Sequence, residues 1–334
     1  MEQLLSLLKT IPEYAAMVSS LQDGESVAVT GIGQINRSHM IAGLCRSLNR
    51  PMVVLCQDDL AARRLQEELK GFLSDTAPIL PGRDLTLYDA AVVSRSWEQK
   101  RLRQLYDLAV GKTSLQIMTW ESLSLRTMPK AALLSAAFSL EVGREYAVED
   151  LISRLTAAGY NRCGMVEGPG QFAVRGGILD IFSPAEDRPV RAEFFGDELD
   201  TMGFFDPATQ RRSENITSVT VLPVAESQPG LHPGGVEGLC KDISSLISRQ
   251  KRRKNINEPL IATLEKDLNK YESGLHNPAS DRYMALIYPE MATAADYIPD
   301  GAVVAVCDHG NLQRAARSRC DEMGMQLDSM LGAG

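Results

Sequence analysis

Short apolar runs alternate with helical patterns through residues 1–134. The apolar runs have the length and composition of buried strands, and they lie at Val27–Val29, Met52–Leu55 and Leu115–Met118. Amphipathic helices are expected between these runs, with a further helix from Trp97 to Val110. Strands that alternate with helices favour a parallel sheet covered on both faces, so this part of the chain is predicted to be α/β.

Polar residues predict where the first two of these helices begin. Ser38 is placed to cap the helix after the first run, and Asp58 or Asp59 is placed to cap the helix after the second. The apolar positions that follow recur at helical spacing, and they are Met40, Ile41, Leu44 and Leu48 in one helix and Leu65, Leu69 and Phe72 in the other.

The hydrophobic pattern changes to a period of two residues between 135 and 224. An amphipathic helix closed by Gly159 opens this stretch. The strands after it are expected at Phe172–Phe182, Val190–Phe195, Thr201–Phe205 and Ile216–Leu222, with a turn at Asp206–Thr209. Because short turns join these strands, antiparallel pairing is expected, and residues 135–224 are predicted to form a separate α+β domain.

Residues 225–334 begin with a looser passage that contains several Pro-Gly steps and the basic run Lys251–Lys254. A last apolar strand is expected at Ala302–Val306, and it resembles the strands of the first part of the chain. The simplest organisation is one α/β domain built from residues 1–134 and 225–334, into which the α+β domain of residues 135–224 is inserted.

The composition is that of a folded protein with more than one core. The 334 residues are 44% hydrophobic and 23% charged, which suits two or three domains. The net charge of −8 argues against a surface that follows a nucleic-acid backbone over its whole length, because phosphate contacts need clustered Lys and Arg. The sequence stops at Gly334 without a strong end signal, so we expect a piece of a longer protein.

The number and spacing of the cysteines and histidines indicate whether disulfides or a metal site are expected. The six cysteines lie far apart and form no CxxC pair, which suggests reduced thiols in a cytosolic protein. With four histidines and no Cys/His cluster, the chain offers no ligand set for a structural metal ion. Neither a metal nor a cofactor is expected.

The segment Ala28–Ile35 has the position of an ATP-binding P-loop, between an expected strand and an expected helix. A P-loop reads GxxxxGK[ST], where the lysine reaches the terminal phosphates and the hydroxyl holds magnesium. Here Gly31 and Gly33 are loop glycines, but Ala28 replaces the first glycine of the motif, Gln34 the lysine and Ile35 the hydroxyl residue. We interpret a degenerate nucleotide loop without hydrolysis, although an ordinary glycine turn explains the glycines equally well.

Two further segments resemble short sequence motifs of ATPases. Gly111-Lys112-Thr113 matches the end of a P-loop but follows a helix, so Gly111 is predicted to end that helix. Asp308 closes the last expected strand, where an ATPase would carry a second acid, yet His309 follows it. His309 as a base would need a positioned partner, so an exposed loop histidine is the simpler interpretation.

The expected strand Val190–Phe195 should present two different faces. Alternate residues of a strand share a side. The inward side would hold Val190, Ala192 and Phe194, and the outward side Arg191, Glu193 and Phe195. Arg175 lies on the preceding strand, with Arg188 nearby in the connecting turn. Exposed arginines around an aromatic residue are typical of a protein-interface hot spot, but a solvated face whose Phe195 packs on a neighbouring element fits as well.

Four runs in this predicted inserted domain resemble the UvrB-homology module that opens bacterial transcription-repair coupling factors. They are Gly159–Arg162, Met165–Phe182, Arg191–Asp200 and Phe205–Pro207. The resemblance is specific over 145–224, weaker but collinear over Gly24–Thr127, and sparse over 225–334. UvrB, the damage-verifying helicase of nucleotide excision repair, shares the module. Three features point away from UvrB itself. They are the altered loop at Ala28–Ile35, the Asp308-His309 pair, and the passage Arg83–Trp97, which is too short to hold the DNA-probing hairpin of UvrB.

The resemblance implies a helicase-like domain of the P-loop NTPase type without ATP chemistry, and an inserted domain that binds UvrA. In the family, UvrA contacts the arginine of an FxxRGxxxD strand and the arginine and second phenylalanine of an RxxFF strand. Those positions here are Arg175, Arg191 and Phe195. The resemblance also implies that RNA polymerase and double-stranded DNA bind an ATP-driven translocase beyond this chain, that a C-terminal domain masks the UvrA face, and that the protein works in the bacterial cytoplasm.

The expected function is therefore a non-catalytic adaptor that binds UvrA and recruits excision repair to RNA polymerase stalled at DNA lesions. Two alternatives stay open. One is a UvrB-like damage-recognition module that binds DNA through Lys251–Lys254, although a solvated helix face or loop explains that run more simply. The other is a divergent ATPase that uses Lys112 or Asp308.

Overall fold

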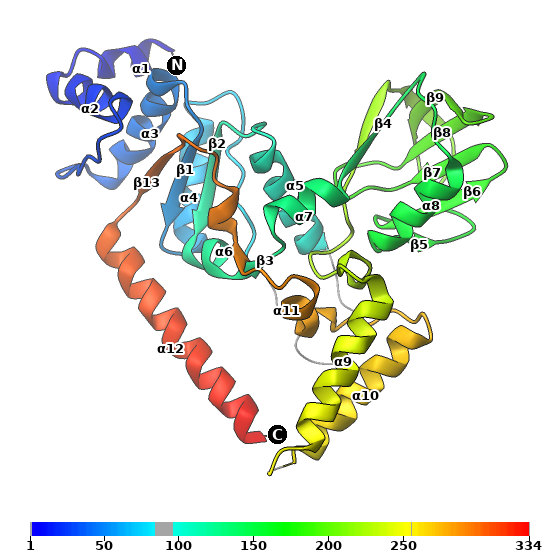
Figure 1. Cartoon of the computed structure of the whole chain (residues 1–334). Coiled ribbons are helices and arrows are strands. Elements are labelled where there is room, and N and C mark those ends of the chain that lie inside the picture. The colour runs from blue at the N-terminus through cyan, green and yellow to red at the C-terminus, as the bar shows by residue number, and fades with distance from the viewer. Residues whose placement is uncertain (1, 84–95, 255, 334) are drawn as a thin grey trace. The chain divides into compact units, whose positions relative to one another are not determined.

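The computed structural model describes residues 2–83, 96–254 and 256–333, and the chain divides into two compact units. Unit 1 contains residues 1–82, 107–125 and 294–327, and unit 2 contains residues 83–106, 126–293 and 328–334. Each unit is assembled from segments that are distant in the sequence, as the colours in Figure 1 show. Non-local contacts therefore define both cores.

A three-stranded parallel sheet forms the centre of unit 1. Its order is β13-β1-β2, with bounds Val303–Val306, Met52–Cys56 and Leu115–Thr119. Met52 on the central strand pairs with Leu115 on one side and with Val303 on the other. The strands expected near 52, 115 and 303 are confirmed, and the last of them joins the first sheet (Figure 1).

The helices that pack against this sheet and bury one shared core are α1 (Glu2–Leu8), α2 (Pro12–Gln22), α3 (Gln34–Leu48) and α4 (Asp59–Lys70). Unit 1 also contains α6 (Trp120–Ser124), the 3-10 turn η3 (Ala294–Tyr297) and most of α12 (His309–Ala333), whose residues from 328 onward belong to unit 2. Leu44, Leu65 and Leu69 supply the apolar sides of α3 and α4, and they are buried with Val54 and Ile117 of the sheet. The helical spacing of these leucines predicted their burial correctly.

Two local predictions in unit 1 are wrong. Val27–Val29 is not a strand: residues 25–30 have no regular structure, and both valines are exposed. An apolar run of three residues forms a strand only if a neighbouring strand accepts its backbone hydrogen bonds, which the run itself cannot reveal. Ser38 does not cap α3, because that helix already begins at Gln34 after Gly33, and Ser38 is buried inside it. Asp58 caps α4 as expected, accepting a hydrogen bond from the Ala61 amide at 2.8 Å.

The largest sheet of the described residues belongs to unit 2 and has six strands in the order β10-β9-β8-β7-β6-β5 (Figure 1). The strands are β5 (Asn161–Arg162), β6 (Gln171–Arg175), β7 (Ile178–Ile181), β8 (Val190–Phe195), β9 (Glu198–Phe205) and β10 (Arg212–Asn215). All neighbours are antiparallel except β5 and β6. The predicted single strand Phe172–Phe182 is instead a hairpin, because Gly176 at φ +59° allows a tight turn with Gly177.

A helix and a second small sheet cover one face of this sheet. The helix is α8 (Val148–Ala157), and the small antiparallel sheet pairs β4 (Phe138–Glu141) with β11 (Ser218–Val221). Leu151 and Leu155 of the helix are buried with Leu179 and Ala192 of the large sheet. Gly159 follows the end of the helix at φ +88°, which confirms the predicted stop.

The remaining elements of unit 2 are mainly helical. They are α5 (Ser96–Ala109), whose last turn belongs to unit 1, the strand β3 (Arg126–Thr127), α7 (Lys130–Ala136), η1 (Pro229–Leu231), α9 (Gly235–Lys251), α10 (Glu258–Glu272), η2 (Ser280–Tyr283), α11 (Met284–Ile287) and the strand β12 (Ala292–Thr293). β3 and β12 pair with each other, and α9 and α10 pack side by side. The expected helix Trp97–Val110 corresponds to α5, and Gly111 at φ +73° follows its end as predicted.

A buried carboxylate, Glu226, ties separate segments of unit 2 together. Its Oε1 accepts from Arg101 Nε at 2.9 Å, and its Oε2 accepts from the Met128 amide at 3.1 Å and from the Thr127 hydroxyl. Arg83, which is also buried, lies 3.9 Å from the same carboxylate and is paired with Asp281. Residues that are 125 and 198 positions apart are thus joined through charges without water around them.

The charge of Glu226 is maintained by these contacts. Burial by itself raises the pKa of Glu226, but the Arg101 and Arg83 guanidinium groups and the hydrogen bond from Thr127 lower it by more. The net pKa is therefore below the usual range for a glutamate, and the group stays ionised in the interior.

We predict that Glu226→Gln lowers the free energy of unfolding by about 3–5 kcal/mol, because it removes the buried negative charge that the Arg101 and Arg83 guanidinium groups face. Urea unfolding at pH 7 measures this loss. Since the folded-state pKa of Glu226 is lowered, its contribution is complete above the unfolded pKa of about 4.3 and is lost as the pH falls through the folded value. The surface pair of Glu214 with Arg188 provides the control, and Glu214→Gln should cost less than about 1 kcal/mol. Equal losses in the two variants would contradict the role of Glu226.

Candidate partner-binding site

Asp180, fully buried on β7, lies at the centre of the candidate site. It is directly opposite Ala173 on β6 and Arg191 on β8. Opposite residues of paired strands share a face, and so do residues two apart in one strand. Asp180, Arg191 and Arg175 therefore project from the same face of the sheet.

Both arginines bind the Asp180 carboxylate. Arg191 donates from Nε to Oδ1 at 2.7 Å and from Nη2 to Oδ2 at 2.9 Å, which is the bidentate geometry of an arginine and a carboxylate. Arg175 donates from Nη2 to Oδ2 at 2.6 Å. The hydrogen bond to Asp180 is the main reason why the pKa of Arg191 is raised. One buried acid thus holds two cations in defined positions.

Arg191 has two further supports. Its guanidinium lies 4.6 Å from the centre of the Phe205 ring, within the range of a cation–π contact. It also donates from Nη1 to the backbone carbonyl of Gln210 and from Nη2 to the side-chain oxygen of Gln210, both at 3.2 Å. Gln210 comes directly after the predicted turn Asp206–Thr209. The turn places the Gln210 backbone in the left-handed region, at a φ of +58°. Arg191 keeps 16% of its side chain exposed and Arg175 keeps 46%.

Phe195, the last residue of β8, is 84% exposed. Val190, Ala192 and Phe194 of the same strand pack into the core on the opposite face, so the predicted alternation is confirmed. The interpretation in which Phe195 packs on a neighbouring element of this chain is wrong, given this exposure. The phenyl ring is a large apolar group with almost no partner in the chain.

The outward face is less open than the strand pattern predicts. Val166, Ala173, Phe182 and Phe205 form a second, smaller core on this side. Arg188 does not join the two other arginines: it pairs with Glu214 at 2.8 Å and stacks on Phe204 at 4.3 Å. The outward face thus divides into a covered part and a part where Arg175, Arg191 and Phe195 reach solvent.

Sequence reasoning missed three residues that build the site: Asp180, Phe205 and Gln210. A signal for Asp180 was present, because an acid in the middle of a strand whose other residues are apolar requires a cationic partner. Phe205 and Gln210 gave no such signal. Their contacts with Arg191 depend on the path of the turn after β9.

The segment Ala28–Ile35, which the sequence predicts to be a degenerate nucleotide loop, belongs to unit 1. Ala28 is in the irregular segment before the loop, Gly31 is exposed at φ +80°, and Gly33 precedes the first residue of α3, Gln34. The backbone of Ile35 belongs to α3, while its side chain lies outside the described residues. Most of the passage Arg83–Trp97 also lies outside them, since residues 84–95 are not described.

A pocket of about 250 Å³ opens at the start of α3. Gln34 and Asp308 both line it, together with the arginines Arg37 and Arg64. Lys112 is not among the residues that line this pocket. His309 is exposed at the first position of α12.

The basic run at the end of α9 is a solvated segment. Lys251 pairs with Glu265 of α10 at 2.7 Å, and Arg252, Arg253 and Lys254 are exposed beyond the helix end. Within the described residues, no three His, Cys, Asp or Glu side chains are grouped as a metal site. In the same residues, no helix combines the length and apolar character needed to cross a membrane.

Comparison with protein families identifies the class of the sheet-bearing segment. Residues 138–226 match the family described as the UvrB interaction domain. The match runs from the first residue of β4 to the buried Glu226, so it contains the complete six-stranded sheet with Asp180, Arg191 and Phe195. Unit 2 therefore contains a segment that is similar to the UvrB interaction domain.

The chain as a whole is similar to transcription-repair-coupling factors. The protein from Bacillus subtilis (strain 168) is 25% identical over 308 residues, which cover 91% of this chain and 26% of the relative. The protein from Myxococcus xanthus is 32% identical over 221 residues, or 64% of this chain and 18% of the relative. The protein from Mycobacterium bovis (strain ATCC BAA-935 / AF2122/97) is 28% identical over 266 residues, or 77% and 21%.

These matches confirm the resemblance to the N-terminal UvrB-homology module of transcription-repair coupling factors. The chain spans about a quarter of the Bacillus relative and less of the other two.

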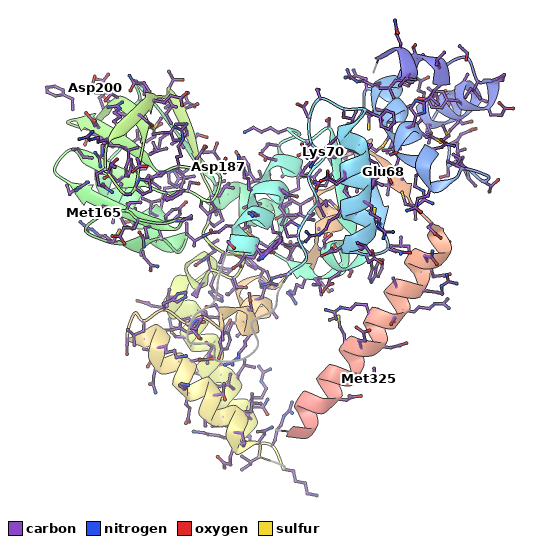
Figure 2. All side chains as sticks on the ribbon, turned by 180° about the vertical axis from the view of Figure 1, so that it is seen from behind. Glu68, Lys70, Met165, Asp187, Asp200 and Met325 are labelled. Carbon is purple, nitrogen blue, oxygen red and sulfur yellow. The ribbon has the colours of Figure 1, made fainter. Side chains whose placement is uncertain are left out.

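We predict that Asp180→Asn lowers the free energy of unfolding by about 1.5–3 kcal/mol, the cost of a lost charged hydrogen bond. The amide of the variant would turn an N–H group towards two guanidinium groups that have only donors. Thermal and urea unfolding measure the effect. Asp200→Asn is the matched control, since Asp200 is an exposed acid on β9 of the same sheet (Figure 2). A neutral Asp180→Asn would show that the arginines do not depend on this carboxylate.

Proposed function

We propose that this chain is the UvrA-docking adaptor of a transcription-repair coupling factor, and that Arg175, Arg191 and Phe195 contact UvrA. The observation that carries the proposal is an 84% exposed phenylalanine beside two arginines held by one buried acid, within the segment that matches the UvrB interaction domain. Docking of UvrA here would recruit nucleotide excision repair to RNA polymerase stalled at a DNA lesion.

The energetics of the exposed groups support this role. A phenylalanine that leaves water on binding contributes about 25 cal/mol for each Å² of apolar surface that becomes buried. The Arg191 guanidinium is already oriented by Asp180 and Phe205, so little side-chain entropy is lost when a partner carboxylate or carbonyl accepts from it. Aromatic and arginine side chains with these properties are the usual hot spots of protein interfaces.

The same proposal assigns the rest of the chain to a supporting role. Residues 135–224 would be the inserted UvrA-binding domain of a helicase-like domain formed by 1–134 and 225–334. The parent protein would bind RNA polymerase and move along double-stranded DNA with ATP through domains beyond this chain, and its C-terminal domain would mask the UvrA face. The greater length of the relatives leaves room for such domains.

Within this chain we infer an adaptor without ATP hydrolysis in the bacterial cytoplasm. Gln34 and Ile35 stand where a P-loop needs a lysine and a hydroxyl. The pocket beside them is lined by Gln34 and Asp308 without Lys112. These replacements support a nucleotide site that has lost its means of holding phosphate and magnesium.

We predict that Arg191→Ala and Phe195→Ala each weaken UvrA binding by about 2–4 kcal/mol, which is roughly 30- to 1000-fold in Kd. Surface-immobilised UvrA titrated with the purified chain measures this change. Phe195→Ala should leave the unfolding midpoint unaltered because the ring has almost no contacts in the chain.

The matched controls are Arg188→Ala, which removes an exposed arginine that pairs with Glu214, and Met165→Ala, which removes an exposed apolar side chain (Figure 2). Both should bind UvrA like the wild type. Wild-type affinity in a folded Arg191→Ala, Phe195→Ala double variant would refute the assigned contacts.

We also predict that calorimetric titration of the chain with Mg-ATP gives no saturable heat, because Gln34 and Ile35 replace the residues that hold phosphate and magnesium. An intact P-loop ATPase titrated under the same conditions is the positive control. Saturable binding with a Kd below the millimolar range would overturn the non-catalytic assignment and favour the divergent ATPase.

A further inference from the structure

Two cysteines face each other at the carboxyl ends of neighbouring parallel strands in unit 1. Cys56 is the last residue of β1, and Cys307 directly follows β13. The register pairs Leu55 with Val306, and the Cys307 amide donates to the Leu55 carbonyl at 3.0 Å, so the parallel pairing continues past the end of β13. The next pair in this register is Cys56 and Cys307, whose side chains share one face of the sheet.

The spacing of the strands suits a covalent link between the two sulfurs. Neighbouring strands lie about 4.8 Å apart, inside the range of roughly 4.4–6.8 Å between the Cα atoms of disulfide-bonded cysteines. Both residues are free cysteines, and each shifts the pKa of the other. A disulfide could therefore form without separating β1 from β13.

The surroundings make the two thiols chemically different. The hydrogen bond from Cys56, followed by the positive charge of Arg37 in the first turn of α3, lowers the pKa of Cys307 although burial opposes this. The same hydrogen bond and burial raise the pKa of Cys56. Cys307 is thus the thiol suited to react as a thiolate, and Cys56 is the thiol placed beside it in the sheet.

A small reagent can reach this pair although both side chains are buried. Cys56 is 2% exposed and Cys307 is 9% exposed, yet both line the pocket of about 250 Å³ at the start of α3. Arg37 and Asn311 line the same pocket and supply hydrogen-bond donors to an oxygen-containing guest. A hydroperoxide is small enough for such a space, whereas a folded protein is not.

We propose that Cys56 and Cys307 form a reversible thiol–disulfide site that a hydroperoxide oxidises. The Cys307 thiolate attacks a peroxide oxygen, the O–O bond breaks, and the departing oxygen takes up a proton to leave as water or an alcohol. Cys307 is then a sulfenic acid. Cys56 sulfur attacks the Cys307 sulfur, the S–S bond forms, and the hydroxyl group leaves with the Cys56 proton as water. Two thiols lose two electrons, and the peroxide gains them.

Oxidation would join the end of β1 to Cys307, which lies two residues before α12. Asp308, at φ +55°, is the one residue between Cys307 and that helix. The disulfide would close a loop that contains residues 57–306, and it would replace two thiols in the wall of the pocket with an apolar bridge. This site is independent of UvrA docking, because it belongs to unit 1 and the docking residues belong to unit 2.

The test treats the purified chain with one equivalent of hydrogen peroxide, blocks the remaining thiols with N-ethylmaleimide, and maps the peptides without reduction. We expect a Cys56–Cys307 disulfide as the main product, with Cys45, Cys163, Cys240 and Cys320 alkylated, and complete reversal by dithiothreitol. In Cys56→Ser, the sulfenic acid on Cys307 should persist and be trapped by dimedone. If the cross-link appears only in urea, or if disulfide-linked dimers through the exposed Cys320 are the main product, the proposal is refuted.

A variant of Arg37 tests whether the two cysteines form a reactive site or are only close together. Arg37→Gln should slow oxidation of Cys307 about tenfold, because removing the neighbouring charge lowers the thiolate fraction. Arg64→Gln is the matched control, since Arg64 is a second arginine of the same pocket and lies on α4. Equal rates for wild type and Arg37→Gln, with both proteins folded, would refute activation by Arg37.

Discussion

A carboxylate in the interior of a protein keeps its charge only where cations and hydrogen-bond donors surround it, and two such carboxylates organise unit 2. Asp180 on β7 is shared by Arg191 and Arg175, and this sharing fixes both guanidinium groups on one face of the sheet. The strand that carries Arg191 ends with the exposed Phe195. The proposed docking surface is therefore a consequence of neutralising one buried acid.

The second carboxylate, Glu226, likewise fixes the positions of the cationic and hydrogen-bonding groups around it, in the part of unit 2 outside the six-stranded sheet. It marks the last residue of the segment that matches the UvrB interaction domain. Its partners come from α5 and from the residues around β3, which precede that segment in the sequence. Through Arg101 and Thr127 the last residue of the matched segment is joined to elements that precede the segment in the sequence.

The core of unit 1 depends on apolar side chains at the right spacing. Leu44, Val54 and Ile117 meet this requirement, and their burial holds the parallel sheet and its helices together. Phosphate binding in a P-loop requires particular side chains at single positions, and Gln34 stands where that motif has a lysine. The pocket at the start of α3 is lined by Gln34 and, among other residues, by two arginines and two cysteines.

The sequence by itself determined the elements that depend on periodicity and on local caps. These include β8 with its inward Ala192 and outward Arg191, the cap of α4 at Asp58, and the ends of helices at Gly111 and Gly159. Each of these follows from interactions within a few residues. The family resemblance also came from local runs, and the comparisons confirmed it.

Only the tertiary structure decided which charges meet and which apolar runs find a partner. Val27–Val29 has the composition of a strand, but no neighbouring strand pairs with it. Asp180 became the centre of the site through the register of β7 against β8, and Cys56 meets Cys307 because a strand near the end of the chain pairs with β1. Such contacts join residues far apart in the sequence, and burial gives them their strength, so no local pattern contains them.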